Sequence, residues 1–130
     1  MIEKLGIFRK EIAARDRIAC RYHENLAAFV IAPPLPSDRT SVWAQYTIRL
    51  SAGHRDAVAA ELKTQGIPTG IYYPKPLHRQ EAYRHFPVGD GGLAVSERLA
   101  GEVLSLPMHA YLDERAQDRI VAAVCRALDG

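Results

Sequence analysis

The sequence is poor in cysteine, tryptophan and methionine, and it carries little excess charge of either sign. Its two cysteines, Cys20 and Cys125, lie far apart and show no metal-binding or redox spacing, so we expect two small apolar side chains without a disulfide. The formal net charge is +2, from 17 basic and 15 acidic residues that are mixed along the chain. Such a surface favours solubility and predicts no nucleic-acid partner.

Long apolar runs are also missing. No stretch approaches the roughly 20 apolar residues that a membrane-spanning helix requires, and the first residues lack the apolar centre of a signal peptide. We therefore expect no membrane partner and a cytoplasmic location.

Several catalytic and ligand-binding motifs are absent as well. No serine stands in a GxSxG turn, and neither cysteine has a histidine in a local nucleophile motif. The glycines of residues 88–92 do not follow a strand and lack the phosphate-binding lysine, which favours a flexible loop. His78 and His85 have only Glu81 between them and no third ligand at a suitable spacing, so no metal site is expected.

What the chain does contain is enough for one packed domain. Its 130 residues are 48% hydrophobic and 25% charged, which is ordinary for a globular protein with its own core. Apolar residues at steps of three and four predict helices over residues 3–29, 53–66, 77–86, 93–104 and from Asp113 onward. Alternation predicts a central strand over 41–50, a second strand over 67–74 and a last one at 105–108. We expect an α+β fold of two layers, with a small, mainly antiparallel sheet of about three strands covered by helices.

Two details of these elements are testable in a structure. Val42, Ala44, Tyr46, Ile48 and Leu50 share one parity in the central strand, which predicts that they form its buried face. Gly66 is placed to end the helix before it in the left-handed conformation, and Asp113 is placed to cap the last helix.

Longer blocks of the sequence resemble a known family. They are "RKEIAARDRIACRYHENLAAF", "VWAQYTIRL", "GIPTGIYYPKPLHRQEAY", "AVSERLAGEVLSLPMHAYLDE" and "DRIVAAV", in that order. Together they resemble the C-terminal small domain of the DegT/DnrJ/StrS nucleotide-sugar aminotransferases. "YYPKPLHRQEAY" and "LSLPMH" are the most specific, since several unlike residue types agree in order there. The form "YYPKPLH" is nearest to the branch that acts on UDP-linked 3-keto sugars in surface-polysaccharide synthesis.

The resemblance implies a fragment of a larger enzyme. Residues 1–30 correspond to the helix between the two domains and residues 41–130 to the small α/β domain. Members are homodimeric fold-type-I transaminases that use pyridoxal 5′-phosphate, and the family's cofactor-binding residues lie in the large domain. None of Lys4, Lys10, Lys63 and Lys75 matches the family's Schiff-base lysine, so no catalytic residue, cofactor-binding residue or bound cofactor is expected in this chain, which is predicted to be inactive alone.

The resemblance also implies a binding role for the block after the second strand. In the family this block faces the mouth of the active site, which makes Tyr72, Tyr73, Pro74, Lys75 and His78 candidates for lining a nucleotide-sugar pocket, with a UDP-sugar as ligand. A phenol stacks on a sugar or uracil face, and a lysine or a protonated histidine meets a diphosphate or a sugar carboxylate.

Two other readings remain open from the sequence. The chain would be a free-standing nucleotide-sugar-binding module without chemistry, or a protein-interaction or dimerisation module that associates through the apolar stripe of its first helix.

Overall fold

The computed structural model of the chain describes residues 2–35, 37–51 and 53–129, with side chains from Leu5 onward. It is a mixed α+β fold, as expected. The elements are α1 (Ile2–Leu26), β1 (Tyr46–Arg49), α2 (Arg55–Thr64), the 3-10 turn η1 (Leu77–Arg79), α3 (Ala94–Glu102), β2 (Val103–Leu106) and α4 (Glu114–Asp129). None of the described helices is both long and apolar enough to span a lipid bilayer.

Strands β1 and β2 pair antiparallel, and their register determines the core. Tyr46 lies opposite Leu106 and Ile48 opposite Leu104, so these four buried side chains share one face of the sheet. On the other face, the hydroxyls of Thr47 and Ser105 lie 2.8 Å apart. The sheet is therefore apolar on one side only, and it needs helices on that side.

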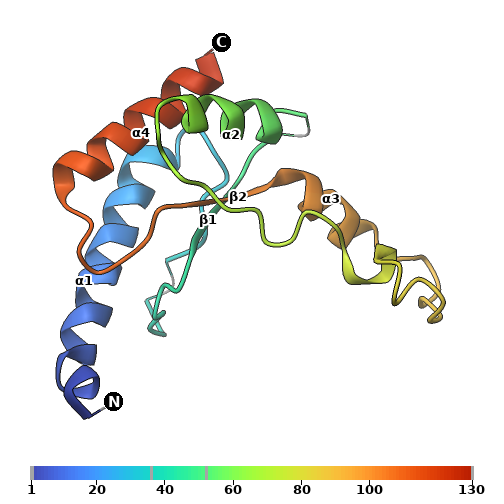
Figure 1. Cartoon of the computed structure of the whole chain (residues 1–130), viewed down its shortest axis with the longest axis horizontal. Coiled ribbons are helices and arrows are strands. Elements are labelled where there is room, and N and C mark those ends of the chain that lie inside the picture. The colour runs from blue at the N-terminus through green and yellow to red at the C-terminus, as the bar shows by residue number, and fades with distance from the viewer. Residues whose placement is uncertain (1, 36, 52, 130) are drawn as a thin grey trace.

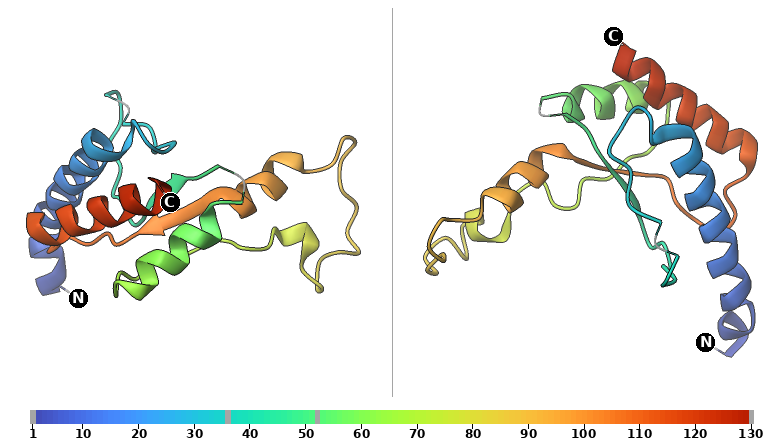
Figure 2. Two further views of the ribbon diagram at one scale, coloured as in Figure 1. Left: turned by 90° about the horizontal axis from the view of Figure 1, so that it is seen from above. Right: turned by 180° about the vertical axis from the view of Figure 1, so that it is seen from behind.

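Helices α1, α2 and α4 cover the apolar face (Figures 1 and 2). Each helix contributes the residues of its inner stripe, such as Tyr22 and Leu26 from α1, Leu62 from α2, and Ile120 and Val124 from α4. Helix α2 packs on α4, and α4 packs on α1. As predicted, Gly66 follows α2 with a φ of +69°, and Asp113 accepts a 2.7 Å hydrogen bond from the backbone N–H of Ala116.

Helix α1 is covered over only part of its length. Its apolar residues from Ile18 to Leu26 are buried, whereas Leu5 is 67% exposed and Phe8 is 42% exposed. The first turns of the helix extend away from the rest of the chain, as Figure 1 shows. The helix ends at Leu26, and Phe29, which the periodicity assigned to the buried stripe, is 58% exposed.

The expected strands are shorter than the alternation suggested. β1 begins only at Tyr46, and before it Val42 and Ala44 are exposed while Trp43 is buried, with a φ of +46°. The Trp43 indole N–H donates a 3.1 Å hydrogen bond to Asp16 of α1, and this contact turns the ring into the core. The prediction of an alternating strand over 41–45 was therefore wrong.

Residues 67–74 do not form the second strand that was expected. Only Gly70 pairs, through two backbone hydrogen bonds to Ser105 of β2. Pro68 and Pro74 lack the amide hydrogen that a longer ladder needs. The sheet of the described chain thus has two strands, extended by this bridge on β2 and by a second bridge between Ile31 and Arg49 on β1. Residues 77–86 likewise form one 3-10 turn followed by turns rather than a helix.

Candidate functional site

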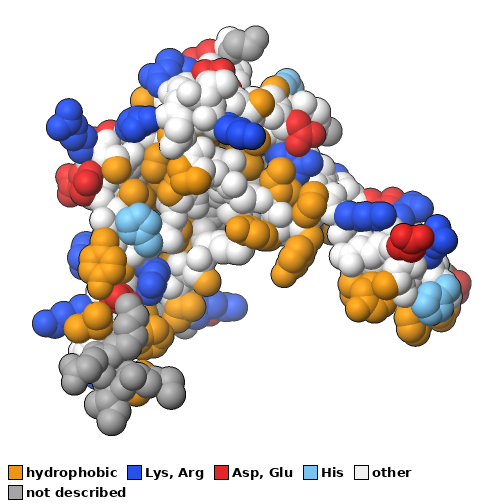
Figure 3. Space-filling view, viewed as in Figure 1, with side chains coloured by type: hydrophobic (Ala, Val, Ile, Leu, Met, Phe, Trp, Pro, Cys, Tyr) orange, Lys and Arg blue, Asp and Glu red, His pale blue; other side chains and the backbone are white. Residues whose placement is uncertain are grey.

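A lobe formed by residues 72–102 projects from the side of the sheet (Figure 1). It contains η1, the loop after it and α3, and it begins at the bridge between Gly70 and β2. Hydrophobic side chains gather on part of the lobe surface in the space-filling view (Figure 3). Most of its large apolar residues are exposed, among them Tyr73 at 74% and Leu77 at 62%. The lobe is therefore a surface with little core of its own.

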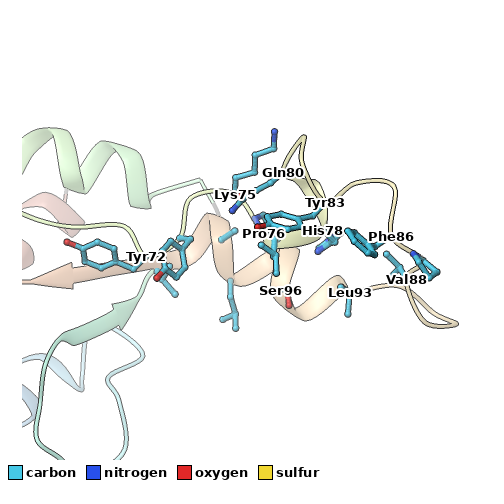
Figure 4. A pocket seen from close by; sticks show the side chains of 16 residues that line it. Tyr72, Lys75, Pro76, His78, Gln80, Tyr83, Phe86, Val88, Leu93 and Ser96 are labelled. Carbon is cyan, nitrogen blue, oxygen red and sulfur yellow. The ribbon is translucent and has the colours of Figure 1, made fainter.

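The lobe contains a groove of about 910 Å³. Tyrosines and aliphatic residues from the loop face aliphatic residues of α3 across the groove (Figure 4). Its apolar lining comprises Tyr72, Tyr73, Pro76, Leu77, Tyr83, Phe86, Pro87, Val88, Leu93, Leu99, Ala100 and Val103. Polar groups are few: Lys75, His78, Gln80 and Ser96. An aromatic groove with a small number of polar groups is typical of a site for a mid-sized organic ligand.

Tyr72 stands where the chain leaves the sheet and enters the lobe. Its ring folds back over Gly70: a Cβ built on that glycine would lie 2.6 Å from a ring carbon of Tyr72. The ring of Tyr73 meets that of Tyr72 edge to face, with centroids 6.3 Å apart. The glycine thus leaves the space that the Tyr72 ring occupies at the entrance of the groove.

An ionic cluster joins the two sides of the lobe. The Nε2 of His78 lies 3.0 Å from Oε1 of Glu97. Arg79 donates a 2.8 Å hydrogen bond from Nε to the same oxygen, and its Nη2 forms an ion pair with that oxygen at 2.6 Å. These hydrogen bonds, first from His78 and then from Arg79, hold the pKa of the Glu97 carboxyl below its ordinary value. The carboxylate therefore remains an acceptor for both side chains and links η1 to α3.

Four of the five candidate residues line the groove: Tyr72, Tyr73, Lys75 and His78. Pro74 does not. It lies on a second, shallower hollow of about 400 Å³ on which Arg55, Lys75 and Arg79 also lie. Lys75 belongs to both hollows, since it stands between Pro74 and Pro76 at the boundary of the two.

Several residues of the groove were not singled out in the sequence. Tyr83, Phe86 and Leu93 follow η1 and precede α3, in a region that the periodicity presented as one face of a short helix and a loop. Glu97 was missed too, although it is the first acidic residue of α3. A run of exposed aromatics in a turn-rich segment was the available signal, because such residues need a partner or a ligand.

The comparisons with known proteins agree with each other. Residues 1–125 match the family model described as the DegT/DnrJ/EryC1/StrS aminotransferase family. The chain belongs to this family. It is 39% identical over 98% of its length to the UDP-2-acetamido-2-deoxy-3-oxo-D-glucuronate aminotransferase of Pseudomonas aeruginosa, of which it covers 33%. It is also 39% identical, over 89% of its length, to the UDP-N-acetyl-3-dehydro-alpha-D-glucosamine 3-aminotransferase of Acidithiobacillus ferrooxidans, of which it covers 31%.

A solved member of the DegT/DnrJ/EryC1/StrS family has the same fold over this region. The crystal structure of an aminotransferase from Brucella abortus superposes with a TM-score of 0.92 at 50% identity, covering 97% of this chain and 33% of that one. The chain thus spans about a third of the length of the relatives that it matches.

In an aminotransferase of this family, pyridoxal phosphate needs a Schiff-base lysine, a phosphate cradle and a carboxylate beside the pyridine nitrogen. Among the described side chains, Lys10 and Lys63 are exposed on α1 and α2, and Lys75 is exposed in the loop. The groove lining described here includes no aspartate or glutamate. These residues do not fit the cofactor by themselves.

Proposed function

We propose that the chain is the small domain of a pyridoxal-phosphate-dependent sugar aminotransferase, in which residues 41–130 form one wall of the sugar-nucleotide site. Membership in the family supports the reaction class, and the two relatives named for UDP-linked keto sugars support the substrate class. The parent enzyme is a cytoplasmic homodimer of polysaccharide or amino-sugar biosynthesis in this proposal. Its large domain supplies the cofactor, which serves as an electron sink for amino-group transfer.

The observation that carries the proposal is the groove itself. Four residues named from the sequence lie along one aromatic hollow of suitable size, between η1 and α3. Tyr72 and Tyr73 present phenol rings that stack on a uracil or sugar face. Lys75 and His78 present the groove's basic groups, and the described lining residues include no carboxylate, although Glu97 behind them pairs with His78. Lys75 thus offers a positive charge to an anionic ligand such as a nucleoside diphosphate.

The role of this chain is then to bind and orient. The stacked rings exclude water from one side of the sugar, and the basic groups bind the charged part of the ligand in a fixed position. Pro74 and Pro76 restrict the backbone on either side of Lys75, so the loop loses less conformational entropy when the ligand binds. Pro74 acts in this way rather than through contact, because it lies on the second hollow.

The test is a titration of the isotope-labelled chain with UDP-N-acetylglucosamine, followed by chemical shifts. Shifts are expected at Tyr72, Tyr73 and His78, with millimolar affinity because two thirds of the relatives' length is absent here. Lys75→Gln should weaken binding, whereas Lys63→Gln, an exposed lysine on α2, is the matched control. No shift in the groove at millimolar ligand, or equal effects of the two variants, would contradict the proposal.

One observation favours a second function, association with another protein surface. Leu5, Ile7 and Phe8 are exposed together on the uncovered half of α1, and Tyr111 is 71% exposed beside them in the hollow that Ile7 lines. In the proposed parent this face packs on the large domain; in a free-standing chain it would mediate dimerisation. Sedimentation at several concentrations distinguishes these two possibilities, because a chain that stays monomeric at every concentration does not act as a dimerisation module.

A further inference from the structure

The hydrogen bond between His78 and Glu97 connects the two walls of the groove. His78 belongs to η1, and Glu97 lies in the first turn of α3, 19 positions later. The His78 side chain is 15% exposed and that of Glu97 is 40% exposed. The imidazole is thus mostly enclosed, while the carboxylate behind it keeps contact with water and remains ionised.

An ionised carboxylate only accepts hydrogen bonds. Arg79 donates one from Nε to Oε1 of Glu97 and forms an ion pair with the same oxygen through Nη2, which further favours the charged form of that carboxyl. The Nε2 of His78 lies 3.0 Å from the same oxygen, so this nitrogen has to carry a hydrogen. The position of Glu97 therefore determines which ring nitrogen is the donor.

The consequence concerns the other ring nitrogen. A neutral imidazole carries one hydrogen, so a hydrogen held on Nε2 leaves Nδ1 as an acceptor, and a charged imidazole carries hydrogens on both. Nε2 is a donor to Glu97 in either state. Only Nδ1 changes its role, and among the described residues no hydrogen bond to Nδ1 is formed, although His78 lines the groove.

We propose that Glu97 is a positioning residue that holds His78 in its Nε2–H form and leaves Nδ1 to the groove ligand. With the ring neutral, Nδ1 accepts a hydrogen bond from a sugar hydroxyl or an amide N–H; with the ring charged, it donates to an anionic oxygen. The identity of the ligand rests on the proposed function, whereas the assignment of the hydrogen to Nε2 does not.

The first experiment is a two-bond proton–nitrogen correlation spectrum of the 15N-labelled chain, recorded without ligand at two pH values. The two ring nitrogens of a neutral histidine give well separated signals, so the spectrum identifies the protonated one. His78 is expected to show Nε2–H. Glu97→Ala removes the acceptor and is expected to give a mixture of the two neutral forms.

Three further variants separate positioning from a merely structural effect. Glu97→Gln keeps an acceptor oxygen at the same reach and is expected to restore the Nε2–H form. Arg79→Gln removes the guanidinium from Glu97 and should leave the His78 pattern unchanged. Glu81→Ala removes an exposed carboxylate of the same loop whose one ion pair among the described residues is with Arg84, at 3.9 Å, and it is the matched control.

Each outcome decides the matter. Nδ1–H in the unaltered chain, or an unchanged His78 pattern in Glu97→Ala, would overturn the proposal. The signals of the other four histidines report whether the fold is intact. If α3 unravels in Glu97→Ala, the Glu97→Gln variant decides instead. Loss of the Nε2–H form of His78 in a folded Glu97→Gln variant would overturn the proposal, and retention of that form would support it.

A later addition of UDP-N-acetylglucosamine separates this inference from the proposed function. An Nε2–H form without any ligand-induced shift would support the role of Glu97 and refute the ligand class. A shift at His78 with the hydrogen on Nδ1 would support the ligand class and refute the role of Glu97.

Discussion

The side-chain amide of Gln117 donates a 2.7 Å hydrogen bond to the carbonyl oxygen of Ile18, inside the core. Gln117 belongs to α4 and is 1% exposed, and Ile18 belongs to α1. This bond attaches the last helix to the first at the level where α1 becomes buried. The segment of α1 from Leu5 to Phe8 has no such attachment among the described residues and remains exposed.

Gln117→Met is expected to destabilise the chain by about 1 kcal/mol, because it keeps the buried volume but removes this hydrogen bond. The measurement is urea unfolding followed by circular dichroism. Gln45→Met, at an exposed position before β1, is the control and should change stability by less than about 0.5 kcal/mol. Equal effects at the two sites would show that the bond to Ile18 contributes nothing.

Tyr46 and Tyr22 stack in the core with ring centroids 5.0 Å apart, but their hydroxyls differ. Tyr22 donates to the carbonyl oxygen of Pro107 at 3.0 Å, whereas the buried Tyr46 hydroxyl has no partner among the described residues. Tyr22→Phe should therefore cost about 1 kcal/mol, and Tyr46→Phe should be neutral or stabilising. Thermal unfolding of both variants at neutral pH tests this difference. An equal loss of stability in Tyr46→Phe and Tyr22→Phe would contradict it.

The same pair predicts a pH effect in alkali. Burial raises the pKa of Tyr46 to about 12, above its ordinary value of 10.0. Because the folded state holds the proton more tightly, its contribution to stability is complete below pH 10 and is lost as the pH rises from there to about 12. Tyr46→Phe should flatten this decline in the free energy of unfolding. An unchanged dependence of that free energy on pH would mean that Tyr46 does not cause the decline.

Helices α1, α2 and α4, and the caps of α2 and α4, could be predicted from the sequence because each depends on local chemistry, whereas the helix expected over 77–86 is only a 3-10 turn. Periodic apolar residues mark α1, α2 and α4, a left-handed Gly66 ends α2, and Asp113 caps α4. The segment 67–74 could not be assigned correctly from its β-type residues, because pairing depends on what the strand meets. Its prolines leave only the Gly70 bridge.

The site shows the same division. The family resemblance of "YYPKPLH" pointed to the residues at the start of the groove, which are adjacent in the sequence. The role of Glu97 depends on a contact across 19 positions between a 3-10 turn and a helix, and neither apolar periodicity nor a local motif relates it to His78. The buried Trp43 is a similar case, because a hydrogen bond to the distant Asp16 overrides the local alternation.

Acid should loosen the connection between η1 and α3. The pKa of Glu97 is depressed by its hydrogen bonds with His78 and Arg79, so its contribution to stability is present above the unfolded value and is lost as the pH falls through the lower folded value. The Arg79 Nε–H signal should therefore move toward that of a free arginine in the acidic range. Glu97→Gln should abolish this pH-dependent change of the Arg79 signal. If the change persists in that variant, another carboxyl causes it.

Gly70→Ala should disturb the groove without unfolding the chain. The added Cβ would meet the Tyr72 ring at 2.6 Å, and that ring turns aside more easily than the backbone, which stays paired with Ser105. We expect Tyr72 chemical shifts to change and nucleotide-sugar affinity to fall, with little change in the unfolding midpoint. Gly101→Ala is the control, because its Cβ would meet no described atom within 4 Å. Equal affinity in both variants would mean that the Tyr72 ring position does not matter for binding.

The two amide replacements of His78 should differ, because they keep different ring positions. The oxygen of an asparagine is bonded to Cγ, as Nδ1 is, whereas that of a glutamine lies one bond further out, as Nε2 does. If Nδ1 is the atom that meets the ligand, His78→Asn should retain more affinity for UDP-N-acetylglucosamine than His78→Gln, by about fivefold for a hydrogen bond of about 1 kcal/mol. Both variants are compared by titration at one pH, with His54→Asn, in the turn before α2, as the control. A tighter His78→Gln variant would mean that the ligand meets Nε2, and that Glu97 competes with the ligand for His78 instead of orienting it.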